Sequence, residues 1–145
     1  MIFVVAIIHC LFSVVCGTVV IVSTQNDFSE AITSGTTIEL ANDIFLSTTI
    51  SISDVVDFHV NGNSFRVDGQ KMVRCFSIIG NSLSQTRVSL SNLTITNCAC
   101  DLSVGSTCDF GGAFFIQEAT LSLQSAIVTE NVATYYGGAF FICSP

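Results

Sequence analysis

Apolar and polar residues alternate along most of this chain after Gly35. Alternation with a period of two is typical of strands that bury one face and expose the other. Most breaks between the runs are single Asn, Asp or Ser residues, and hairpin dipeptides such as Asn61-Gly62 are rare. The alternating apolar pairs are Ile38/Leu40, Ile44/Leu46, Ile50/Ile52, Phe58/Val60, Phe65/Val67, Val88/Leu90, Leu93/Ile95 and Leu121/Leu123. The pattern predicts many short strands without the long helices that βαβ crossovers need.

One segment before Gly35 has a helical pattern instead. Phe28, Ala31 and Ile32 have the i, i+3, i+4 spacing of a single helix face. Either residue of Asn26-Asp27 can cap the start of a short helix, and Gly35 can end it. We expect this helix to cover the first layer of a stack of strands.

A hexapeptide, Gly-Gly-Ala-Phe-Phe-Ile, occurs twice, at 111–116 and at 137–142, with an offset of 26 residues. A period of this size indicates a stacked repeat. The segments before it, 88–99 and 121–133, align with Val88 over Leu121, Leu90 over Leu123 and Ile95 over Val128, at an offset of 33. The difference of seven residues falls between Ile95 and Gly111, which predicts a loop inserted in the earlier repeat.

These observations predict an all-β fold, a right-handed single-stranded parallel β-helix with a short N-terminal capping helix. Each coil of such a solenoid stacks on the one before it at about 4.8 Å. A β-sandwich would not require a repeated Gly-Gly corner. We place the cap at about 18–35 and roughly four coils over 36–145. The last strand has no cap after it, so we expect an incomplete solenoid belonging to a longer repeat protein.

Residues 1–17 are predicted to be a signal peptide, because 1–16 are apolar and uncharged and small residues precede a cleavage point after Gly17. This N-terminal stretch has no Lys or Arg, and apolar residues continue to Val22. A retained membrane anchor is therefore the alternative, and membrane contact is expected only in that case.

Charge and motifs exclude several classes of function. Four Lys and Arg residues against eleven acids, a net charge of −7, do not form the basic footprint of a nucleic-acid-binding protein. The glycines form no nucleotide-binding motif and the cysteines lack the spacing of a structural zinc site. We therefore expect no cofactor, no metal-binding residues and no nucleic-acid partner.

Five cysteines remain after signal cleavage, and an odd number leaves one without a partner inside the chain. We expect a disulfide between Cys100 and Cys108, which would close the inserted loop, and Cys98–Cys108 remains open as an alternative. Cys75 lies within an apolar run, so we interpret it as a buried small apolar residue.

The second hexapeptide, together with Thr-Glu-Asn at 129–131, resembles the repeat of polymorphic outer membrane proteins, which couples GGA-[ILV] with FxxN. Val128 stands at the Phe position of that element, and the upstream segments 28–46 and 56–69 look like coils of pectin-lyase-like proteins. The resemblance implies a secreted or cell-surface β-helix with an adhesive role. It also implies these structural repeat residues: Gly111, Gly112, Ala113, Asn131, Gly137, Gly138 and Ala139.

Candidate catalytic residues are few, because the carboxylates are spread singly along the chain. The closest groups, Asp54/Asp57 and Asp101/Asp109, are interpreted as turn residues, and we assign no catalytic residue. The basic residues Arg66, Lys71 and Arg74 could serve as a proton acceptor and a substrate clamp, but no carboxylate cluster accompanies them. His59 is predicted to point outward.

Aromatic residues suggest a binding platform: the Phe pairs 114–115 and 140–141, and Tyr135-Tyr136. Alternation places Phe114 and Phe115 on opposite faces, and we expect Phe114 and Phe140 to form an outer row covered by loops. Separately, Asn92-Leu93-Thr94 is a sequon for N-glycosylation in a eukaryotic secreted protein.

The function we expect is a secreted or cell-surface module with an adhesive or structural role and without catalysis. Its partner would be a surface protein or a carbohydrate. The alternatives are a remnant of a polysaccharide-degrading β-helix enzyme and a carbohydrate-binding β-helix.

Overall fold

The computed structural model describes residues 17–81, 85–99 and 110–143, which form short strands and one short helix. The elements in chain order are β1 (Thr18–Val22), α1 (Gln25–Glu30), β2 (Thr36–Leu40), β3 (Ile44–Phe45), β4 (Ile50–Ser53), β5 (Phe58–Asn61), β6 (Arg66–Asp68), β7 (Phe76–Ile79), β8 (Thr86–Ser91), β9 (Thr94–Thr96), β10 (Phe114–Gln117), β11 (Ala119–Gln124), β12 (Ile127–Thr129) and β13 (Phe140–Cys143).

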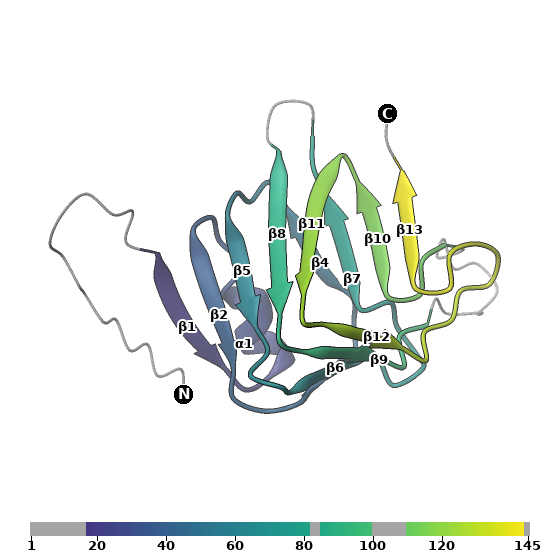
Figure 1. The fold of residues 1–145 in the computed structure, drawn as a ribbon, viewed down its shortest axis with the longest axis horizontal. Helices are drawn as coiled ribbons and strands as arrows, with labels where there is room; N and C mark the ends of the chain where they lie inside the picture. The colour runs from purple at the N-terminus through teal and green to yellow at the C-terminus, as the bar shows by residue number, and fades with distance from the viewer. Residues whose placement is uncertain (1–16, 82–84, 100–109, 144–145) are drawn as a thin grey trace, which may run out of the picture.

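The strands form three parallel sheets (Figure 1). The first sheet has the order β1-β2-β5-β8-β11, the second contains β3, β6, β9 and β12, and the third contains β4, β7, β10 and β13. The chain visits the three sheets in turn, so β2-β3-β4, β5-β6-β7, β8-β9-β10 and β11-β12-β13 are successive coils. The prediction of an all-β parallel β-helix is confirmed.

Strand register confirms the alignment of the last two coils. β10 and β13 pair with Phe114 opposite Phe140, at the predicted offset of 26 residues. β9 and β12 pair at an offset of 33, with Thr94 opposite Ile127. The change between these offsets falls between β9 and β10, where the inserted loop was predicted, although 100–109 lie outside the described residues. The other predicted partners are Val88 with Leu121, Leu90 with Leu123 and Ile95 with Val128.

The core consists of ladders, in which side chains at equivalent inward positions of successive coils stack on one another. An aromatic ladder occupies the third sheet, where the ring of Phe114 stacks on Phe76 at 5.3 Å and on Phe140 at 5.0 Å between centroids. Phe28 from α1 reaches this ladder, with its ring 6.2 Å from that of Phe76. Phe28, Phe76 and Phe114 are fully buried, so the helix closes the N-terminal end of the core.

The capping helix differs in detail from its prediction. Thr24 is the N-cap, and its side chain accepts a hydrogen bond from the backbone N–H of Asp27. Neither Asn26 nor Asp27 holds that position, because the helix begins at Gln25. It ends at Glu30, before Gly35, which has a φ of 73° and turns the chain into β2.

Single residues with positive φ turn the chain between sheets. Asn92 and Ser125 occupy equivalent corners with φ of 53° and 51°, and Asn97 and Glu130 occupy the next with 52° and 55°. Asn and Ser tolerate this left-handed conformation better than bulky residues because their short polar side chains bond locally. These bends let each coil turn sharply without a hairpin.

Candidate functional site

The two Gly-Gly-Ala segments form stacked corners that lead into β10 and β13. The backbone N–H of Gly112 donates to the carbonyl oxygen of Gly138 at 3.0 Å, which joins the two corners directly. Gly111 and Gly137 have φ of 62° and 65°, where a side chain would be strained. The glycines therefore turn the backbone and bring successive coils close together.

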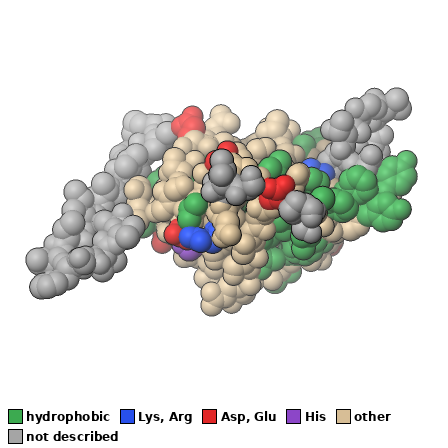
Figure 2. Space-filling model, turned by 90° about the horizontal axis from the view of Figure 1, so that it is seen from above, with side chains coloured by type: hydrophobic (Ala, Val, Ile, Leu, Met, Phe, Trp, Pro, Cys, Tyr) green, Lys and Arg blue, Asp and Glu red, His purple; other side chains and the backbone are tan. Residues whose placement is uncertain are grey.

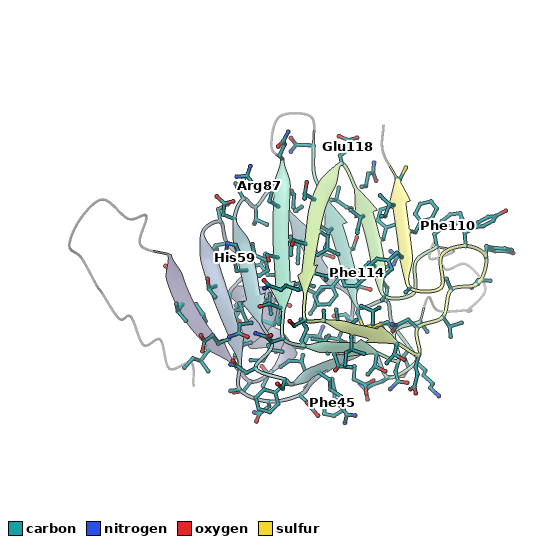
Figure 3. The ribbon with its side chains drawn as sticks, viewed as in Figure 1. Phe45, His59, Arg87, Phe110, Phe114 and Glu118 are labelled. Carbon is teal, nitrogen blue, oxygen red and sulfur yellow. A yellow bond between two sulfur atoms is a disulfide. The ribbon has the colours of Figure 1, made fainter. Side chains whose placement is uncertain are left out.

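Four aromatic side chains lie against one another around this corner, and we call them the outer aromatic cluster: Phe110, Phe115, Tyr136 and Phe141. Ring centroids are 4.5 Å apart for Phe110 and Phe141, 5.7 Å for Phe115 and Phe141, and 5.8 Å for Phe110 and Tyr136. The planes of each pair lie within 25° of parallel. Phe110 lies beyond the strands at the end of the molecule near β13 (Figure 3).

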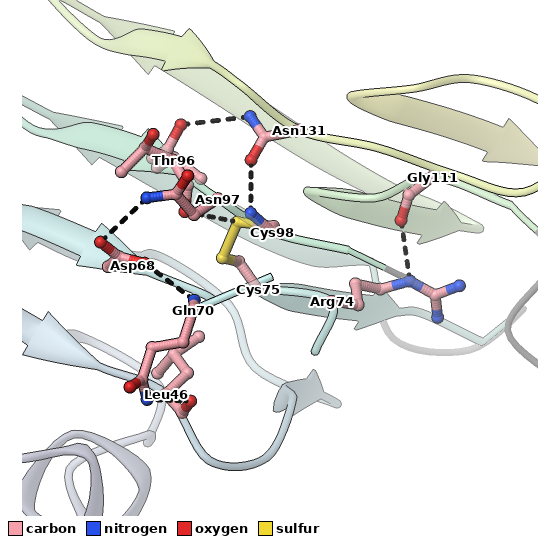
Figure 4. Close-up of a disulfide and its surroundings, with 11 residues drawn as sticks. Leu46, Asp68, Gln70, Arg74, Cys75, Thr96, Asn97, Cys98, Gly111 and Asn131 are labelled. Carbon is pink, nitrogen blue, oxygen red and sulfur yellow. Dashed lines mark hydrogen bonds between the residues drawn. A yellow bond between two sulfur atoms is a disulfide. The ribbon is translucent and has the colours of Figure 1, made fainter. Parts of the chain in front are cut away.

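The Arg74 side chain hydrogen-bonds to the backbone of the first Gly-Gly-Ala corner, next to the outer aromatic cluster. Its guanidinium donates from Nε to the Gly111 carbonyl oxygen at 3.0 Å (Figure 4). A terminal nitrogen of the same group donates to the Phe110 carbonyl oxygen. The same group lies 5.0 Å from the ring centre of Phe115. Partial burial lowers the pKa of Arg74 through desolvation, but an arginine side chain remains charged. Arg74 therefore ties two members of the cluster to the coil beneath them.

The surface around the cluster is apolar and exposed. Tyr135 is 70% exposed and Tyr136 is 67% exposed. Val132, three residues before Tyr135 in the chain, is also exposed. Figure 2 shows hydrophobic side chains gathered at the end of the molecule that holds the last coil. Exposed apolar patches of this kind mark interaction surfaces in soluble proteins.

The prediction of which faces of β10 and β13 point into the core is wrong. Phe114 is fully buried and points between the sheets, whereas Phe115 is half-buried and belongs to the outer row (Figure 3). Ala113 is also buried, because it ends the corner and does not continue the alternation of the strand. The outer row is therefore Phe115 and Phe141, and Phe140 is 37% exposed only because it lies in the last coil.

A disulfide joins Cys75 and Cys98 in neighbouring coils (Figure 4). The Cys98–Cys108 alternative is therefore wrong. Cys75 is buried as predicted, but as half of a disulfide. The pairing arises because stacking brings the corners between the second and third sheets together, at a Cα separation of 5.4 Å. The expected Cys100–Cys108 pair lies outside the described residues.

Asn131 bridges the last two coils beside this disulfide. Its Oδ1 accepts from the backbone N–H of Cys98 at 2.8 Å, and its Nδ2 donates to the Ile95 carbonyl oxygen at 3.2 Å. The sequon residue Asn92 is exposed, and its amide donates to the side chain of Asn61 at 3.2 Å.

The candidate carboxylates are engaged in ordinary surface contacts. Asp57 pairs with Arg87 at 3.0 Å, Asp43 pairs with Arg66 at 3.0 Å, and Asp54 accepts a hydrogen bond from an asparagine amide. Arg66 and Arg74 thus serve different contacts and form no shared clamp.

The structure does not bring the remaining candidate catalytic and metal-binding residues together. His59 is exposed on β5, pointing outward as predicted. Asp101 and Asp109 lie outside the described residues. Across 17–81, 85–99 and 110–143, no three His, Cys, Asp or Glu residues are grouped as a metal site requires.

Sequence reasoning missed Phe110 and the role of Arg74. A signal for Phe110 was present, since an aromatic residue precedes each Gly-Gly: Phe110 before Gly111 and Tyr136 before Gly137. These two aromatics form a parallel bridge in the structure. Nothing local connects Arg74 with carbonyl groups 36 and 37 residues further on.

Comparison of the chain with protein-family models, curated proteins and solved structures finds no match. In the part of the chain that the structure describes, no helix is both long enough and apolar enough to cross a bilayer.

Proposed function

We propose that this chain is a non-catalytic β-helix module, secreted or displayed at a cell surface, which binds a partner in an adhesive or structural role. The observation that carries the proposal is the outer aromatic cluster with the exposed Tyr135 beside it. Tyrosine, tryptophan and arginine are enriched among the residues that dominate binding energy at protein interfaces. Tyrosine offers a large contact area with only two rotatable side-chain bonds.

The frame beneath the cluster supports this role. Stacked glycine corners and the Arg74 guanidinium hold the backbone under the rings before any partner arrives. A pre-organised surface loses less conformational entropy on binding than a flexible one. The apolar, uncharged segment 1–17 supports secretion as part of the proposal.

The repeat is assigned, as part of the same proposal, to the type found in polymorphic outer membrane proteins. Its support is the pair of stacked Gly-Gly-Ala corners and the use of the Asn131 side chain to bond the coil below. In this assignment the glycines of the two corners and Asn131 have structural roles, and the aromatic residues around them are the candidate binding residues.

A cell-binding assay with the full chain tests the proposal. Replacement of Tyr135 and Tyr136 by serine should weaken binding at least about tenfold, because a central aromatic typically supplies 2 kcal/mol or more. Matched controls are Phe45→Ser and Met72→Ser, which alter large side chains that are 51% and 55% exposed elsewhere. Binding unchanged in the tyrosine variant, or cleavage of a uronate polymer by the wild-type chain, would overturn the proposal.

Carbohydrate is the second candidate partner, and the exposed rings of Tyr135 and Tyr136 favour it because aromatic faces can stack on the apolar faces of sugars. Immobilised glycans would retain the wild-type chain and release the double tyrosine variant. Retention by protein-coated surfaces alone would assign the site to a protein partner.

A further inference from the structure

Asn92 lies at an exposed corner in the middle of the solenoid, where β8 turns into β9. Coils stack on both sides of this corner. The backbone N–H of Asn92 donates to the Gln124 carbonyl oxygen at 3.1 Å, and the Asn92 carbonyl oxygen accepts from the Ser64 N–H at 2.7 Å. Asn92 is exposed although both neighbouring coils are in place. Its exposure is therefore a property of the lateral surface of the solenoid.

The residues around Asn92 form an acceptor triplet for N-glycosylation. Of the asparagines in the sequence, only Asn92 has a hydroxyl residue two positions later, Thr94, with a residue other than proline between them. Thr94 is partly exposed at the start of β9, whereas Leu93 is buried in the core. The backbone thus turns the two polar members of the triplet outward and anchors the apolar one.

The left-handed corner explains an asparagine at this position but does not explain the threonine. Asn92 has a φ of 53°, which asparagine tolerates, and Ser125 occupies the equivalent corner of the next coil. The position of Thr94 is held by Arg66 in the coil before and by Ile127 in the coil after. Stacking in this row accepts a charged and an apolar side chain, so packing does not require a hydroxyl group there.

The Asn92 amide can carry a sugar without losing its contact in the structure. Its Nδ2 atom has two hydrogens, and it donates to Oδ1 of Asn61 at 3.2 Å. Glycosylation replaces one hydrogen, so the other can still donate. The adjacent corner residues are exposed and small: Asn63 and Ser64 in the coil before, and Ser125 in the coil after. A bulky, solvated group would therefore project from this corner without displacing a packed side chain.

We propose that Asn92 carries an N-linked glycan, an inference that rests on the secretion included in the proposed function. The step is the transfer of an oligosaccharide from a lipid-linked pyrophosphate donor. A bond forms between C1 of the first sugar and Nδ2 of Asn92, and the bond between C1 and the pyrophosphate oxygen breaks. The amide loses one proton, and the lipid pyrophosphate leaves.

The glycan and the outer aromatic cluster occupy different corners. The glycan covers the corner between the first and second sheets, where β8 leads into β9 (Figure 1). The outer aromatic cluster lies after the second sheet, around the corner that leads into β10. Partner binding and glycosylation can therefore be tested separately.

Expression of the full chain in eukaryotic secretory cells tests the inference. Peptide N-glycosidase should lower the apparent mass of the chain and convert Asn92 to aspartate, which peptide mass spectrometry locates. Thr94→Ala should abolish the shift while leaving Asn92 in its corner, and Thr94→Ser should retain it because serine keeps the hydroxyl. Asn63→Gln is the matched control, an exposed corner asparagine with a φ of 49° outside the triplet, and it should leave the shift unchanged.

A second version of the chain, with a cleavable host signal in place of 1–17, separates this inference from the proposed secretion. A glycan on this version alone would refute secretion through 1–17 and support the acceptor site. Absence of the glycan from both versions overturns the inference, as does a glycan that persists in Thr94→Ala. Asn92→Gln replaces Thr94→Ala if the latter does not fold, and the same outcomes apply. Absence of cell binding by a glycosylated chain would overturn the proposed partner and support the inference.

Discussion

Replacing Phe114 by alanine should destabilise the protein far more than replacing Phe115, its neighbour in β10. The two residues share one strand and one chemistry, but Phe114 is fully buried and Phe115 is half-buried on the outer face. The pair therefore measures which face of the repeated Phe-Phe segment belongs to the core.

The expected magnitudes follow from the contacts of each ring. Phe114 is stacked between Phe76 and Phe140, and truncation of a buried phenylalanine costs about 3–5 kcal/mol. Phe115 loses the ring of Phe141 and the Arg74 guanidinium, which contribute about 1 kcal/mol each at such a site. We expect a difference of about 1–3 kcal/mol in the free energy of unfolding.

Urea denaturation of the oxidised chain, followed by circular dichroism, measures the effect. With a slope of about 2 kcal/mol per molar urea, the midpoints of the two variants should differ by about 1 M. Phe114→Leu keeps most of the volume and serves if the alanine variant does not fold. Equal midpoints, or a larger loss for Phe115→Ala, would refute the assignment of the inner face.

Three further comparisons test the stacking of the coils. Gly112→Ala should cost about 2 kcal/mol, since its Cβ would clash with the carbonyl oxygens of Val132 and Gly138. Gly138→Ala should stay within about 0.5 kcal/mol because the nearest atom would be 3.5 Å away; similar melting temperatures for the two variants would contradict this. Asn131→Ala should cost about 1–3 kcal/mol in urea denaturation, because it leaves the Cys98 N–H without its acceptor; an unchanged midpoint would show that water replaces the amide. Joint replacement of Cys75 and Cys98 by alanine should cost about 3 kcal/mol, the chain-entropy value for a loop with a sequence separation of 23. Calorimetry of that variant showing no loss would mean that coil packing alone holds this corner.

The candidate site was only partly predictable. The repeated hexapeptide marks the correct corner, and Phe115, Phe141 and Tyr136 are among the aromatic residues that the sequence suggests as a binding platform. Arg74 could not be assigned there, because its partners lie in the next coil, 36 and 37 residues further on, and their contact depends on strand register. Register is a property of the stacked coils, and coil lengths here vary with the loops between strands.

The fold class follows from local features of the amino-acid sequence. Period-two alternation, single-residue bends and the offsets of 26 and 33 residues were sufficient, since each is a local requirement of short strands in stacked coils. At Phe114 and Phe115 both faces of the strand are apolar, and only tertiary packing shows which face points into the core. Alternation distinguishes the two faces of a strand but does not say which one is buried. Tertiary packing also decided the Cys75–Cys98 pairing, since a disulfide joins residues that packing brings together, whatever their distance along the chain.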